Sequence, residues 1–112
     1  QVVQNLVGKV DAIYVPTDNM VAAGITTVGM IAREAKIPVI CGEEGPTMRG
    51  GLATYGINYY ELGKLTGRQA VSILRDEKNI ADMPIEYVSS FNLTVNEDMA
   101  SAIGIAIPSD LR

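Results

Sequence analysis

Apolar residues recur along the chain at two different spacings, and the changes of spacing divide it into expected strands and helices. Three short apolar runs rich in strand-forming residues end at proline or glycine, as buried strands do: 12–15, 37–41 and 52–56. Between them, apolar positions repeat every three or four residues, which predicts helices over 19–36 and 58–78. A helix between two buried strands implies that the first two strands are parallel.

The remaining segments complete the expected fold. The first ten residues resemble the end of an amphipathic helix, a brief helix is expected around 47–49, and the run over 85–95 favours extended structure. Asn96 can cap a final short helix through Ala102. The sequence therefore predicts an α/β domain in which helices flank a mostly parallel sheet.

Two glycines interrupt the helix expected over 19–36. Gly24 and Gly29 each weaken a helix by about 1 kcal/mol relative to alanine. We therefore expect them to be present because the helix packs closely on the sheet.

Composition is that of a folded protein of one domain at most. The chain has 112 residues, of which 47% are hydrophobic and 20% are charged. Its net charge is -4 and its nine basic residues are scattered, whereas phosphate binding needs clustered lysine and arginine. A nucleic-acid partner is therefore not expected.

Several kinds of chemistry are disfavoured by what the sequence lacks. It contains no histidine, which removes Ser-His and Cys-His nucleophilic catalysis and imidazole general-base chemistry. Cys41 is the single cysteine, so the chain has no paired cysteines for zinc or redox work. We expect no catalytic residues, no metal site and no cofactor.

The beginning of the chain predicts an internal position in a longer protein. It starts QVVQNLVGKVD, with no initiator methionine and without the basic-then-apolar layout of a signal peptide. No apolar run approaches the roughly 20 residues that a membrane span requires. A secretion signal, if the protein has one, is expected to lie outside these residues.

Ligands of parallel sheets bind beyond the carboxyl ends of the strands, where the loops into helices converge. Three loops there carry polar groups: 16–19, 42–45 and 55–58. In the first, Thr17, Asp18 and Asn19 follow a proline, and any of the three could cap the next helix. One cap needs one residue, so the surplus leaves open whether Asp18 starts a helix or holds a ligand.

Longer motifs give the chain a family resemblance. The segments DAIYVPTDNMV, IPVICGEEG, GGLATYGINYYELGKLTGRQAVSIL and MPIEYVSSFNLTVNEDMASAIGIAIPSDL follow one another over essentially the whole sequence. Together they resemble the carboxyl-terminal portion of the substrate-binding proteins of ABC transporters. Within those, the chain is most similar to the family assigned to tryptophan and tyrosine uptake.

The resemblance implies a two-lobed protein, two to three times longer, that closes on a small ligand and delivers it to an ABC permease. Residues 1–56 and 84–112 would then lie mainly in one lobe, and the helix over 58–78 in the other. Such proteins are extracytoplasmic, either periplasmic or lipid-anchored at the outer face of the cell membrane. The expected ligand is an aromatic amino acid.

The same resemblance implies a ligand-binding role for Asp18, whose carboxylate could pair with the ammonium group of an amino acid while Thr17 or Asn19 caps the helix. Thr17 and Asn19 are also hydrogen-bonding candidates, and Glu44 and Tyr55 are further candidates from the neighbouring loops. Glu43 and Glu44 are adjacent carboxylates, which could suggest acid-base chemistry or a cation site. The alternative is that they belong to an ordinary solvated loop.

Two other classes of protein remain alternatives. Bacterial repressors carry effector-binding domains of the same two-lobed design, and a helix-turn-helix upstream would mark that class. A small α/β enzyme or phosphoacceptor domain would need clustered acids at strand ends and a later lysine, an arrangement that the sequence lacks. With half of a binding clamp, this chain alone is expected to bind poorly and to self-associate, as a dimer that exchanges the helix over 58–78.

Overall fold

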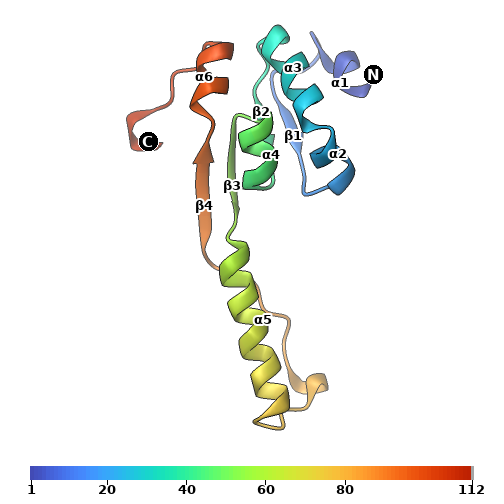
Figure 1. Ribbon diagram of the computed structural model, residues 1–112, viewed down its shortest axis with the longest axis vertical. Helices are drawn as coiled ribbons and strands as arrows, with labels where there is room; N and C mark the ends of the chain where they lie inside the picture. Colours follow the sequence, from blue (N-terminus) through green and yellow to red (C-terminus); the bar gives the residue numbers. More distant parts are fainter. Residues whose placement is uncertain (112) are drawn as a thin grey trace. The chain divides into compact units, whose positions relative to one another are not determined.

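The computed structural model describes residues 1–111 and divides them into two compact units. The first unit comprises 1–56 together with the residues from Leu93 onward, and the second comprises Ile57–Asn92 (Figure 1). These bounds resemble the two-lobe division expected from the sequence. The assignment of the units to two lobes stays a prediction.

The first unit is built on a four-stranded sheet in the order β1-β2-β3-β4. The strands β1 (Ile13–Val15) and β2 (Val39–Cys41) are parallel, with Ile13 opposite Val39 and Val15 opposite Cys41, and β2 is parallel to β3 (Ala53–Ile57). β4 (Phe91–Val95) runs in the opposite direction (Figure 1). The predicted mostly parallel α/β sheet is confirmed.

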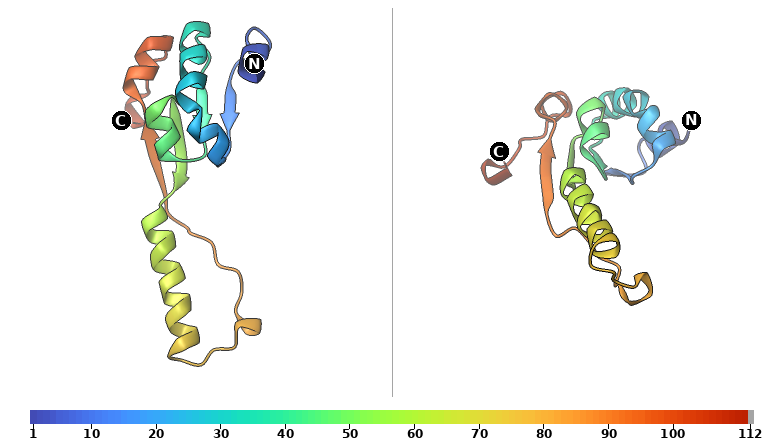
Figure 2. Two further views of the ribbon diagram at one scale, coloured as in Figure 1. Left: turned by 45° about the vertical axis from the view of Figure 1, so that its right-hand side comes forward. Right: turned by 60° about the horizontal axis from the view of Figure 1, so that its bottom comes forward.

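Helices cover one face of this sheet (Figure 2). They are α2 (Asn19–Ala23), α3 (Ile25–Ala35) and α4 (Glu44–Arg49), preceded by the short α1 (Val2–Leu6). The prediction of one continuous helix over 19–36 is wrong in one respect, because Gly24 separates α2 from α3. The backbone N–H of Gly24 closes α2 on the carbonyls of Met20 and Val21, and α3 starts immediately afterwards.

The main core lies between the covered face and α3. Alternate strand residues point into it, including Ile13 and Val15 of β1 and Val39 and Cys41 of β2, where they meet the fully buried Ile25. The intervening residues point to the other face, on which Tyr14 and Tyr55 are 68% and 70% exposed. A parallel sheet usually has both faces covered, so this open face is unusual for a complete domain.

A second, smaller core forms around α6 (Glu97–Ile103), where Met99, Ala100 and Ile103 pack with Leu52. Asn96 caps α6 as predicted: its Oδ1 accepts from the backbone N–H of Met99 at 3.0 Å. Its Nδ2 donates to the carbonyl oxygen of Thr47 at 3.1 Å, near the end of α4. One side chain therefore serves the start of one helix and the end of another.

The double role of Asn96 predicts a large effect of its removal. Asn96→Ala should lower the free energy of unfolding by about 2 kcal/mol, because a cap and a partly buried hydrogen bond are both lost. Asn96→Ser keeps a capping oxygen and loses only the amide donor, so about half of the loss is expected. Urea unfolding of both variants measures the difference. Equal stabilities of the alanine variant and wild type would contradict this role.

The second unit consists mainly of α5 (Tyr59–Leu74), followed by a short 3-10 helix, η1 (Ile80–Asp82). Asn58 caps α5 by accepting from Glu61 N at 3.1 Å. The predicted helix over 58–78 is thus correct in kind but ends four residues early. The predicted extended run over 85–95 is a strand only from Phe91 onward. No residue of this unit is buried, which leaves α5 without a core within the part of the chain that the structure describes.

Candidate functional site

The carboxyl ends of β1, β2 and β3 lie side by side, as the sequence predicts for parallel strands. The backbone N–H of Gly42 donates to the carbonyl oxygen of Val15 at 2.8 Å, joining the ends of β2 and β1. The loop at 16–19 therefore lies beside the loop that begins at Gly42. Thr17, Asp18 and Asn19 are all exposed at this edge.

Asp18 is the residue that caps α2. Its Oδ1 accepts from the backbone N–H groups of Met20 and Val21 at 2.8 and 2.9 Å, and its own backbone is extended at φ -145°. The expectation that Thr17 or Asn19 would cap is therefore wrong. Asn19 is already the first residue of the helix, and Thr17 lies one residue too early to supply the cap.

Capping leaves part of Asp18 available. Both hydrogen bonds that the structure gives its side chain end on Oδ1, so among the described residues Oδ2 has no hydrogen bond or ion pair. The cap also fixes the side chain, because two backbone donors hold one of its oxygens. The carboxylate is thus oriented and negatively charged, with one oxygen open to an incoming donor.

Glu44 and Tyr55 occupy different surroundings. Glu44 is exposed, but it is the first residue of α4 and not part of a loop as expected. Tyr55 lies within β3 rather than in a loop, on the face of the sheet that the helices leave open, two residues beyond Ala53, which pairs with Ile40 of β2. The ligand-binding roles of Thr17, Asp18, Asn19, Glu44 and Tyr55 all stay predictions.

A buried hydroxyl in this region was not foreseen from the sequence. Thr54 is 2% exposed, and among the described residues its Oγ1 has no hydrogen-bond partner. It points to the helix-covered face of β3, next to Gly56 near the strand's end. The alternation of β3 could have placed Thr54 inside, but no local pattern indicates that its hydroxyl would lack a partner.

Cys41 is buried at the end of β2. Burial raises the pKa of its thiol above the usual range, the negative charge of Glu43 acts in the same direction, and a hydrogen bond with the Thr47 side chain opposes them. The thiolate is the reactive form of cysteine, so the structure describes an inert, structural thiol.

Two consequences of the raised pKa can be measured. A thiol reagent should modify the native protein at least about tenfold more slowly than the urea-unfolded protein at pH 8. Because the folded state disfavours the thiolate, the contribution of Cys41 to stability is present below its usual pKa and is lost as pH rises through the raised value. Rapid native modification at pH 8 would contradict this burial.

Neither a metal site nor a membrane span is found in the described part of the chain. Over residues 1–111, no three His, Cys, Asp or Glu side chains form a group able to hold a metal ion. Over the same residues, no helix is both long enough and apolar enough to cross a bilayer.

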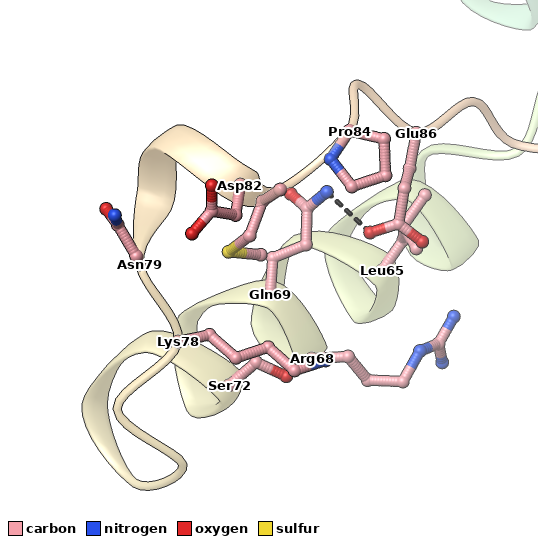
Figure 3. Close-up of a pocket in the computed structure, with 10 residues that line it drawn as sticks. Leu65, Arg68, Gln69, Ser72, Lys78, Asn79, Asp82, Pro84 and Glu86 are labelled. Carbon is pink, nitrogen blue, oxygen red and sulfur yellow. Dashed lines mark hydrogen bonds between the residues drawn. The ribbon is translucent and has the colours of Figure 1, made fainter.

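The second unit contains a surface groove of about 590 Å³, and none of the predicted site residues lines it. Leu65, Gln69 and Ser72 of α5 line one side, and the segment from Lys78 to Glu86 lines the other (Figure 3). Gln69 Nε2 donates to Glu86 Oε2 at 2.6 Å across it. Because none of its lining residues is buried, this is a surface groove of a unit without a core.

Relatives of known structure share this fold. A ligand-free, open structure of a substrate-binding protein with adhesive properties from Clostridium difficile is 47% identical, with a TM-score of 0.78 over 98% of this chain and 37% of that one. An ABC domain in complex with L-Trp from Streptococcus pneumonia is 34% identical, with a TM-score of 0.83 over 97% of this chain and 38% of that one.

A curated relative and a family model give the same result. A tyrosine-binding protein of Clostridioides difficile (strain R20291) is 39% identical over 103 residues, which are 92% of this chain and 30% of the relative. The chain thus spans about a third of the length of the relatives it matches. The family model for the ABC transporter substrate binding protein matches residues 1–112. The resemblance read from the motifs is confirmed, and the chain belongs to the family of ABC transporter substrate-binding proteins.

Proposed function

We propose that this chain forms part of the binding clamp of an ABC importer, and that the clamp closes on an aromatic amino acid. The observation that carries the proposal is the capped Asp18, whose second carboxylate oxygen is open at the carboxyl edge of a parallel sheet. Relatives described as tyrosine-binding or as a complex with L-Trp support the class of ligand.

The chemistry of Asp18 suits the ammonium group of an amino acid. The α2 cap orients the carboxylate, and a charge-assisted hydrogen bond to an ammonium contributes roughly 1.5–3 kcal/mol. Thr17 and Asn19 flank Asp18 at the same edge and add neutral hydrogen-bonding groups. Glu44 is exposed at the start of α4, after the neighbouring strand β2, where its charge would reinforce the attraction for a cation.

The wider biological role follows from the family. Residues 1–56 and 84–112 are assigned mainly to one lobe, and the helix over 58–78 to the other. The whole protein would bind its ligand outside the cytoplasm, in a periplasm or lipid-anchored at the outer face of the membrane, and pass it to a permease. It would act as a binding protein without catalysing a reaction. The family match favours this role over that of a repressor-type regulator.

The first test is binding itself. The natural full-length protein should be stabilised by L-tyrosine or L-tryptophan in a thermal-shift screen of the common amino acids. A ligand at one hundred times its dissociation constant adds about 2.7 kcal/mol, which raises the midpoint by about 5 °C or more. If no amino acid shifts the midpoint, the proposed ligand class is wrong.

We also expect the 112-residue chain by itself to form dimers that exchange α5. Its open sheet face exposes Tyr14 and Tyr55, and α5 buries none of its residues, with Leu74 82% exposed. Such surfaces favour association with a second copy. Light scattering of the isolated chain should report a dimer, and Leu74→Lys should weaken it. A strictly monomeric chain at high concentration would contradict this expectation.

A further inference from the structure

Two neighbouring strands carry a glycine near their carboxyl ends at the proposed binding edge: Gly42 directly follows β2, and Gly56 is the penultimate residue of β3. Backbone conformation does not explain either one. Among the described residues, the glycines with positive φ are Gly8 and Gly104. An L-residue could therefore adopt the backbone of Gly42 or Gly56, and the need for glycine must come from the space around each.

The space beside Gly42 is filled by the loop that carries Asp18. A Cβ on Gly42 would lie 3.0 Å from both the backbone nitrogen and the Oγ1 of Thr17, and 3.3 Å from the carbonyl carbon of Pro16. Because Gly42 has no side chain, the loop rests directly against the end of β2. Thr17 immediately precedes Asp18, so this contact limits where the carboxylate can stand.

The same arrangement recurs one strand further along. A Cβ on Gly56 would lie 2.9 Å from Thr54 Oγ1, 3.2 Å from the carbonyl oxygen of Gly42 and 3.4 Å from Cα of Glu43. The loop after β2 therefore rests on β3 much as the loop after β1 rests on β2. The two glycines therefore fix the spacing between the loop after β1, the loop after β2 and the end of β3.

We infer that Gly42 is a positioning residue of the amino-acid site, one that sets the place of the Asp18 carboxylate through its contact with Thr17. The inference rests on the binding role proposed for Asp18. The Thr17 loop is exposed, so a methyl group at residue 42 would push it outward by a few tenths of an ångström rather than unfold the sheet. A charge-assisted hydrogen bond is short and directional, and it weakens with such a shift.

The test compares two alanine substitutions in the natural full-length protein. Gly42→Ala should weaken binding of L-tyrosine and L-tryptophan by about tenfold, the loss of part of one charge-assisted hydrogen bond. Gly45→Ala is the matched control, since a Cβ on Gly45, three residues along, would meet nothing within 4 Å. Calorimetry gives the dissociation constants, and thermal unfolding of the ligand-free proteins reports any general loss of stability.

A double-mutant cycle separates positioning from a structural defect. If Gly42 acts through Asp18, Gly42→Ala should cost little further affinity once Asp18→Asn has removed the charge. Equal tenfold losses in both backgrounds would overturn the inference. The inference would also be overturned if Gly42→Ala and Gly45→Ala both bound the amino acid as tightly as wild type. The proposed function would stand in that case. A wild-type protein that binds neither amino acid would overturn both.

Discussion

Asp18→Asn should weaken binding of the aromatic amino acid by roughly 10- to 100-fold while leaving the ligand-free protein nearly as stable as wild type. Asparagine is as good a helix cap as aspartate, so its side-chain oxygen can still accept from Met20 N and Val21 N. The substitution removes the negative charge that would pair with the ligand's ammonium, a loss of about 1.5–3 kcal/mol.

Asp18→Ala supplies the contrast. It removes the charge and the cap together, so the ligand-free protein should also lose about 1 kcal/mol of stability. Titration calorimetry of the full-length protein gives affinity, and urea unfolding without ligand gives stability. If Asp18→Asn binds as tightly as wild type while Asp18→Ala is destabilised, the carboxylate is a helix cap only, and the ligand must be held by other groups.

The elements that the sequence predicted correctly are those set by local patterns. The parallel strands β1 and β2, the helix that starts after Asn58 and the cap at Asn96 each follow from a few neighbouring residues. Gly24 was harder to interpret, because a glycine in a helix can mark close packing or a break. The expectation that close packing explains Gly24 is wrong, because a Cβ there would come near only the carbonyl oxygens of Met20 and Val21, in its own preceding turn.

The candidate site shows a similar limit. Three polar residues in a row could each cap α2, and only the backbone geometry, extended at Asp18 and helical from Asn19, distinguishes them. The sequence placed Asp18 at the correct edge because strand ends of a parallel sheet converge. The contact between Gly42 and Thr17 joins residues 25 positions apart, and no spacing pattern encodes it.

Gly29 and Gly50 show what close packing requires. The two residues face each other where α3 passes the end of α4, and a Cβ on Gly29 would lie 2.7 Å from Cα of Gly50. A Cβ on Gly50 would overlap the carbonyl oxygen of Ile25, a fully buried residue. Both obstacles are backbone atoms of packed elements, which cannot rotate away as a side chain could.

Gly50→Ala should therefore lower the free energy of unfolding by about 3 kcal/mol, near the upper end of overpacking effects. Gly45→Ala, in the open first turn of the same helix, should leave stability unchanged or slightly raised. Urea midpoints of the full-length variants measure both. Equal midpoints would mean that α4 can move away from α3 at little cost. Gly50→Ala should therefore cost more stability than Gly42→Ala. An added methyl group against exposed Thr17 shifts a loop, whereas one against buried Ile25 must separate two packed helices.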